Sequence, residues 1–458
     1  MANPNLVTPG VTYAQDYNLK TLVLLTSGGS FDLKNSLVEL TYFEDIFSNC
    51  VSGYLQISDA QGLIEKLHMI GNEYIRISFT KASEDDFIND LIFRVHKISS
   101  RQLVGNSTTE GYVINFCSDE LVLSEQYKVS KSYKDKKISD IITDILTNYL
   151  KVDPNNKVVD IEETQGVYSF IVPNFKPLEA INWVSTYAQS ATPGSYGSDM
   201  LLFEDSQGFH FFSLQTLFMQ DPLRTYTYAP KNIDNKTGTQ DQKFYGVNSY
   251  QIVDAFDTLN AINTGVFANR LITIDPLLLR WNIVDFNYDT YFNNSTQLNK
   301  YSITNGVTNR FGDKVYETPQ AVLKMATTNK NQKDIPYIGS KPDAYSHDIF
   351  LEKYVPTRTS QLSLTNYNKV KLFMDGDPSI TVGSVINFNL VSMDPATQGK
   401  ELDKYYSGKY LISALKHTFK VDGYKMIIEI VKESVPNEYV TPDTNSTIWK
   451  NTVAGKLW

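Results

Sequence analysis

The sequence contains little cysteine and no long hydrophobic run. Its 458 residues include two cysteines, Cys50 and Cys117, each within a strand-like run. Such positions favour buried free thiols, in keeping with assembly in a reducing cytoplasm. The apolar stretch at 21–25 is too short to span a bilayer, and no basic segment precedes it. We therefore expect a soluble, unprocessed chain that does not insert into a membrane.

Basic residues are too few for a protein that grips nucleic acid. The chain has 42 Lys plus Arg against 51 Asp plus Glu, which gives a formal net charge of −9. Binding to DNA phosphates depends on clustered positive charge that displaces counterions. Tight, sequence-independent DNA binding is therefore not expected.

The residue spacings that mark metal and nucleotide sites are missing as well. The two closest of the five histidines, His68 and His96, are 28 positions apart, so no helical His pair exists. The cysteines lack zinc-finger spacing, and no glycine-rich phosphate loop or nucleophile elbow occurs. The sequence predicts no catalytic residue, no cofactor-binding residue, no metal ligand and no cofactor.

The polar residues that stand out have simple structural interpretations. Glu84-Asp85-Asp86 lacks the alternating spacing of a calcium loop, so we expect a solvated turn. Asp205 lies in a hairpin turn signal, Glu162-Glu163 is expected to be exposed, and His417 is expected to be a strand residue with a local hydrogen bond. None of them supports catalysis, so the chain is not expected to be an enzyme.

Aromatic residues and a period of two dominate the first part of the chain. Aromatics make up 12% of the residues, 29 of them Tyr, which favours strands and interfaces. From Leu37 to Cys117 apolar and polar residues alternate, as at Ile75, Ile77 and Phe79, and short turn segments separate the runs. This pattern predicts a first antiparallel β domain over residues 1–130.

The period changes to that of a helix after residue 130. Apolar residues from Ile138 to Tyr149 follow one helical stripe, and a second helix is expected to begin at Pro177. Residues 168–172 between them predict a strand, and Asp205-Ser206-Gln207-Gly208 predicts a hairpin turn. A mixed α+β domain is therefore expected over 131–235.

The remaining half is expected to divide into three segments. Residues 236–349 predict an irregular, extended segment with long polar loops that partly completes the β domains. Strand runs and the hairpin signal Asp422-Gly423 predict a second β domain over 350–438, and residues 439–458 predict a C-terminal tail. The expected fold class is thus mainly β with α+β parts.

Three segments carry patterns that occur in a shared order. The first runs from Leu37 to Phe79, the second crosses from Tyr168 to Trp183, and the third covers Gly376 to Glu433. Together they resemble the central baseplate hub protein of contractile phage tails, a T-even-type hub related to the hub part of type VI secretion spikes. The signature scaffold residues of this resemblance are Gly53, Asp59, Gly71, Glu73, Pro173, Pro177, Trp183, Gly383, Gly408 and Tyr410.

The resemblance implies two tube-type antiparallel β-barrel domains joined by a mixed α+β domain. It also implies a homotrimer whose six barrels form a pseudo-sixfold ring between a hexameric tail tube and a trimeric central spike. The implied partners are the tail tube protein, the central spike protein and other baseplate proteins. DNA would pass through the lumen without specific binding, and the protein would reside in the virion baseplate after assembly in the host cytoplasm.

Other functions stay open at this point. A tail-tip hub of a non-contractile phage and a type VI spike base differ from the first hypothesis chiefly in their assembly partners. A carbohydrate-binding or carbohydrate-active β protein is a more distant alternative, suggested by tyrosine-rich β domains. Stacked aromatics beside a carboxylate pair would support it, and the sequence shows no such pair.

Overall fold

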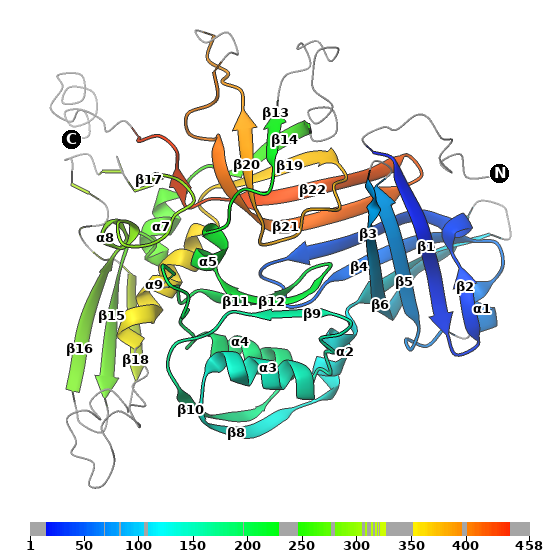
Figure 1. The fold of residues 1–458 in the computed structure, drawn as a ribbon, viewed down its shortest axis with the longest axis horizontal. Helices are drawn as coiled ribbons and strands as arrows, with labels where there is room; N and C mark the ends of the chain where they lie inside the picture. The colour runs from blue at the N-terminus through cyan, green and yellow to red at the C-terminus, as the bar shows by residue number, and fades with distance from the viewer. Residues whose placement is uncertain are drawn as a thin grey trace.

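The computed structural model shows a mainly β protein with α+β parts, which confirms the predicted fold class (Figure 1). It describes residues 15–228, 246–326 and 351–439, except 68, 82–83, 105–108, 196, 276–279, 305–306, 309–312, 315–316, 318, 320 and 396–400. The polar segments at 231–242 and 327–333, expected to be loops, lie outside the described residues. Both cysteines are buried free thiols, as expected.

The first β unit is a strongly curled antiparallel sheet. Its strand order is β3-β4-β7-β6-β5-β1-β2. The residues just before β1 lie beside the turn that joins β21 to β22. There the Tyr424 amide donates to the Gln15 carbonyl at 2.9 Å. The elements are β1 (Tyr17–Thr26), β2 (Gly29–Asp32), a 3-10 turn (Lys34–Ser36), β3 (Leu37–Asp45), β4 (Ser52–Asp59), α1 (Leu63–Leu67), β5 (Tyr74–Lys81), β6 (Glu84–Leu103) and β7 (Glu110–Cys117).

The second β unit closes on itself. Its strands follow the order β14-β19-β22-β21-β20-β13, and a bridge between Thr227 and Gly246 joins β13 to the start of β14. The Tyr228 and Tyr250 rings pack edge to face across this seam at 4.8 Å. The strands are β13 (Thr225–Tyr228), β14 (Val247–Asp254), β19 (Lys369–Asp375), β20 (Val385–Leu390), β21 (Gly408–Lys420) and β22 (Gly423–Val431).

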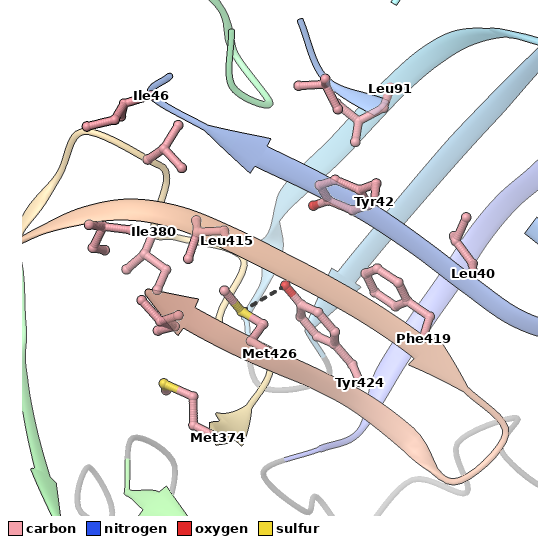
Figure 2. Packing of buried hydrophobic residues seen from close by; sticks show 14 of the residues in the cluster. Leu40, Tyr42, Ile46, Leu91, Met374, Ile380, Leu415, Phe419, Tyr424 and Met426 are labelled. Atoms are coloured by element: carbon pink, nitrogen blue, oxygen red, sulfur yellow. Dashed lines mark hydrogen bonds between the residues drawn. The ribbon is translucent and has the colours of Figure 1, made fainter. Parts of the chain in front are cut away.

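The β21–β22 hairpin belongs to both β units. Near its start β21 pairs with β20 of the second unit, and from Ala414 to Lys420 it pairs with β3 of the first. The expected Asp422-Gly423 turn joins the two strands. Figure 2 shows Phe419, Tyr424 and Met426 of this hairpin facing Leu40 and Tyr42 of β3. The two units therefore share one continuous hydrophobic core.

The α+β unit packs its own core around the predicted helices. The stripe from Ile138 is buried on α3, and Pro177 is the first residue of α4, as expected. The Asp205–Gly208 turn joins β11 to β12, while β9 adds a parallel strand. The elements are α2 (Asp119–Gln126), β8 (Val129–Lys136), α3 (Ile138–Asn148), β9 (Val158–Ile161), β10 (Tyr168–Phe175), α4 (Pro177–Ser185), β11 (Met200–Glu204), β12 (Gly208–Ser213) and α5 (Leu214–Phe218).

A third core lies beside these units. It joins the sheet β16-β15-β18 to helices α7 and α9 through buried apolar residues such as Phe267, Tyr288 and Leu364. The elements are α7 (Thr258–Thr264), β15 (Ala268–Asp275), β16 (Arg280–Asn287), α8 (Tyr288–Phe292), β17 (Tyr301–Ser302), β18 (Ala321–Ala326), α9 (Leu351–Leu364) and β23 (Ser434–Val435). The division of the chain at residues 130, 235, 349 and 438 remains a prediction.

One local expectation was wrong. Glu84-Asp85-Asp86 begins strand β6 and is not a turn between strands. Glu84 pairs with Lys81 of β5, so the acidic cluster begins inside a strand. After Glu84 the register shifts and the ladder continues at the pair of Phe79 with Asn89, so pairing with β5 reaches this polar segment at Glu84. A neighbouring strand can impose an extended conformation on residues whose composition suggests solvation.

Candidate functional site at the junction of the β units

Signature residues of the first segment shape one end of the first β unit. The Asp59 carboxylate accepts hydrogen bonds from the amides of Gln61, Gly62 and Leu63, and it fixes the entry to α1. The Glu73 carboxylate accepts from the amides of Ile70 and Gly71. Both acids are buried, and both hold backbone in place.

Gly53 allows three strands to pack closely. A Cβ on Gly53 would lie 2.4 Å from the Thr41 carbonyl oxygen and 2.6 Å from the Phe116 ring. Both distances are shorter than van der Waals contact, so the backbone and the ring must move apart to accept a methyl group. The residue is thus needed for packing, wherever the partner surfaces lie.

We predict that Gly53→Ala lowers the free energy of unfolding by about 1–3 kcal/mol, the usual cost of overpacking a core. Chemical denaturation followed by fluorescence would measure it. Gly28→Ala is the matched control, because the nearest atom to its added Cβ is 3.7 Å away. Equal stability of the two variants would show that the strands can separate at no cost.

The second signature segment forms a small aromatic cluster. Pro173 lies in β10, and Pro177 opens α4, where Trp183 packs edge to face with Phe170 and Phe175 at 5.5 and 5.6 Å. These residues join the β8–β10 sheet to α4. They contribute to the core of the α+β unit.

The third signature segment lies in the second β unit. Gly408 has a φ of 124°, a conformation that side chains rarely adopt, and an added Cβ would lie 2.7 Å from Asn299 Oδ1. Gly383 lies against the ring of Phe203. Tyr410 is buried and its hydroxyl donates to the Tyr406 carbonyl at 2.7 Å. The ten signature residues therefore lie in three separate places and are not gathered into one site.

The structure gathers a different set of residues at the junction of the first β unit with the α+β unit. Lys157 Nζ lies 2.9 Å from Glu120 of α2 and 2.5 Å from Glu204 of β11. The other Glu204 oxygen accepts from the Val51 amide at 2.9 Å. Burial raises the pKa of Glu204, whereas the two carboxylates raise the pKa of Lys157 against the effect of its own burial. We call Glu120, Lys157 and Glu204 the junction triad.

A second buried polar group lies where the β11–β12 hairpin meets both β units. Glu44 of β3 is buried, and burial together with the nearby Asp205 carboxylate raises the pKa of Glu44 well above its usual range. Asp205 accepts from the Gln207 and Gly208 amides and contacts His210 at 3.0 Å. The prediction that Asp205 shapes a turn is confirmed.

His417 lies on the other side of Glu44. Its Nδ1 is 2.8 Å from the Tyr424 hydroxyl, and its ring stacks on Tyr42 at 4.2 Å. Burial lowers the pKa of His417 to about 3, so the ring is neutral at neutral pH. His417 is a strand residue with a local hydrogen bond, as expected.

Sequence reasoning misplaced Glu162. This residue was expected to be exposed but is buried, and its carboxylate accepts hydrogen bonds from the Ser213 amide and from the hydroxyls of Ser190, Thr192 and Thr216. Those donors come from loops and elements that are distant in sequence. Only the neighbouring Glu163 is exposed, and it pairs with Lys137.

A third contact that the sequence did not indicate attaches α9 to the α+β unit. The Arg358 guanidinium donates to the carbonyls of Ser198 and Met200 at 2.8 and 3.3 Å. Asp199 between them is fully buried, and burial raises the pKa of Asp199 to about 6. No spacing pattern among the residues around 190–216 predicted the Arg358 contacts or the burial of Asp199.

Metal-binding clusters and membrane-spanning helices are absent from the described residues. In that part of the chain, no group of three His, Cys, Asp or Glu side chains is placed to hold a metal ion. No described helix combines the length and apolar character needed to cross a membrane. The buried acids instead lie where units meet: Glu204 accepts from Val51 of the first β unit, and Glu44 of β3 lies near Asp205 of the α+β unit.

One exposed surface is strongly apolar. The outer face of the β16-β15-β18 sheet carries Ile274 opposite Trp281, with Ile283 and Val322 nearby. Trp281 is 70% exposed. The Arg270 and Asp285 side chains pair at 2.6 Å further along the same sheet. Exposed apolar faces of this kind are typical of protein interfaces.

The sequence matches no family model and no curated protein. The structure is similar to the 43 kDa tail protein of prophage MuSo2 from Shewanella oneidensis, with a TM-score of 0.54 and 8% identity over 90% of this chain and 98% of that chain. A tail protein from Neisseria meningitidis MC58 gives a TM-score of 0.51 and 8% identity over 91% of this chain and 97% of that chain. A type VI secretion component of E. coli gives 0.41 at 8% identity, over 93% and 79% of the two chains.

The first two similarities extend over nearly the whole length of both chains, so they concern the arrangement of all units and not one shared barrel. At 8% identity they establish the fold and leave the activity to be argued separately. This chain has the fold of these two tail proteins.

Proposed function

We propose that this chain is the structural hub of a phage tail baseplate, of the T-even contractile type. Three copies form a pseudo-sixfold ring that joins the hexameric tail tube to the trimeric central spike. The ring leaves a channel for genome ejection, and other baseplate proteins bind around it. The protein acts by assembly and carries out no catalysis.

The observation that carries this proposal is the pair of β units built on one hairpin. Because β21 pairs with β20 and β3, the two units are held side by side by main-chain hydrogen bonds. Three copies of such a chain would present six β units around one axis, and a threefold object could then match a sixfold tube. Two separate barrels on a flexible linker would not fix this spacing.

The buried polar contacts support a rigid hub. The junction triad holds Glu204 in place within the α+β unit, and Glu204 attaches that unit to the first β unit by accepting from the Val51 amide. The Arg358 contacts attach α9 to the α+β unit. The net charge of −9 also fits a channel that DNA crosses without binding, since carboxylates repel phosphates. The free buried thiols agree with assembly in the host cytoplasm before the protein enters the virion.

The solution mass tests the proposal. One chain has a mass of 51.9 kDa, and we expect a trimer of about 156 kDa, with the spike protein added if needed, by light scattering. Electron microscopy should show rings with six similar lobes that bind tail tube protein. A stable monomer that forms no ring with tube or spike protein would overturn the proposal, and glycan binding by that monomer would favour the carbohydrate alternative.

A further inference from the structure

Strand β8 has an open edge. Within the described residues it pairs only with β10, in a two-stranded sheet at the bottom of the α+β unit (Figure 1). Its register with β10 shifts between Tyr133 and Lys136, where Asp135 has a φ of 50°, and no described strand pairs with the far side of β8. Open edges of this kind act as templates for strand addition.

A groove runs beside that edge. Helix α3 follows β8 after one residue and turns back along it, and a groove of about 470 Å³ lies between them. The groove is lined by both elements, including Lys131, Tyr133 and Lys136 of β8 with Asp140 and Asp144 of α3. Its volume lies within the range of roughly 300–1,000 Å³ typical of ligand sites.

The wall of the groove is fixed by one hydrogen-bond cluster. The Asp144 carboxylate accepts from Lys131 Nζ and the Tyr133 hydroxyl at 2.7 Å, and from Asn148 at 2.8 Å. Partial burial opposes ionisation, yet these donors hold the pKa of Asp144 below its usual range. The negative charge of Asp144 is thus satisfied within the protein, and the groove has no need of a bound cation.

The charge of the edge is opposite to that of the chain. Residues 128–137 contain five lysines and one acid, Asp135, in a protein of net charge −9. Lys131 and Lys137 pair with Asp144 and Glu163. Lys128, Lys134 and Lys136 are exposed, and the structure shows no carboxylate within ion-pair distance of them among the residues it describes.

We propose that β8 binds an extended, acidic segment of a partner protein as an added strand. Main-chain hydrogen bonds to the open edge would supply the affinity, and carboxylates of the added strand would pair with Lys134 and Lys136. The side chains that point toward α3 would occupy the groove. The site is present in a single chain, so this inference does not depend on trimer formation.

Edge lysines also serve to prevent unwanted strand pairing, which is the main competing explanation. An edge protected by charge alone needs no groove beside it, whereas here the open edge and the groove coincide. The two explanations predict different behaviour for Lys134→Ala/Lys136→Ala. If the lysines only prevent unwanted strand pairing, the variant should self-associate. If they bind an added acidic strand, the variant should bind an acidic peptide more weakly.

The probe is a fluorescein-labelled Thr-Glu repeat peptide, and binding to the full chain is followed by fluorescence anisotropy. We expect binding that slows hydrogen exchange of edge amides within 129–136. Lys134→Ala/Lys136→Ala should weaken it about tenfold, as two exposed ion pairs allow. Lys66→Ala/Lys97→Ala is the matched control, since it removes the same charge from exposed positions on the first β unit, and it should leave binding unchanged.

Two further probes separate strand addition from simple charge attraction. The same peptide with every backbone amide N-methylated keeps its carboxylates but cannot donate a hydrogen bond from either edge, so its binding should be lost. The proposal would be overturned if the N-methylated peptide bound as tightly as the unmodified peptide. It would also be overturned if the control variant lost as much affinity as Lys134→Ala/Lys136→Ala, or if the peptide left hydrogen exchange of the β8 amides unchanged. Competition by double-stranded DNA as strong as by the acidic peptide would also overturn it, in favour of a general polyanion surface.

Discussion

Lys157→Met should lower the free energy of unfolding by about 3 kcal/mol or more. The substitution keeps the length of the side chain but leaves Glu120 and Glu204 facing each other without a cation. Glu204 is almost fully buried, with 2% of its side chain exposed. Removal of one partner from a buried ion pair costs about 3–5 kcal/mol, because the remaining charge stays desolvated. Chemical denaturation of the purified variant would measure the loss.

Two variants separate this effect from a general loss of charge. Lys137→Met removes a lysine whose partner Glu163 is largely exposed, so the expected change is below about 1 kcal/mol. Lys157→Met/Glu204→Gln should recover part of the stability, because the amide oxygen can still accept from Val51. A Lys157→Met protein as stable as the Lys137→Met control would show that the junction triad does not stabilise the folded protein.

His417 should make the protein less stable as the pH falls below neutrality. Its pKa is about 3 in the folded protein against an ordinary value of 6.5. Between these values the unfolded chain binds a proton that the folded chain does not, so the stability falls as the pH is lowered. From pH 6.5 to pH 4 the contribution is about 3 kcal/mol, at roughly 1.36 kcal/mol for each pH unit.

The neighbouring acid complicates a direct pH titration. The pKa of Glu44 is raised, so this group alone would make the protein more stable as the pH falls. The difference in stability between the wild type and His417→Gln cancels the Glu44 contribution. At pH 7 we expect the variant to be less stable than the wild type, because stacking on Tyr42 is lost. At pH 4 we expect the two proteins to be equally stable, because only the wild type is destabilised as the pH falls. A deficit that stays constant from pH 7 to pH 4 would contradict the prediction.

Local patterns were sufficient to predict most of the regular structure. The apolar stripe of α3, Pro177 at the start of α4 and the turn at Asp422-Gly423 each depend on residues close in sequence. Periodicity and turn chemistry report such features because they act over a few residues. The fold class follows from their order along the chain.

Contacts between distant segments could not be predicted in the same way. Glu162 is buried because hydroxyls from residues 190–216 surround it. The 13-residue strand β21 gave no sign that its two ends pair with different units. The junction triad likewise combines α2, β11 and the loop before β9. Such features depend on tertiary arrangement, which no local pattern encodes.

The shared hairpin also sets an order for biosynthesis. Thr41 of β3 faces Thr418 of β21, which is 377 residues later in the chain. At about 5–20 residues per second, a ribosome needs roughly 20–75 s to make the intervening segment. The edge of β3 that pairs with β21 therefore stays unpaired until translation is almost finished. Nascent chains of this protein should need protection by a chaperone during that interval, and only a nearly full-length chain can become competent for assembly.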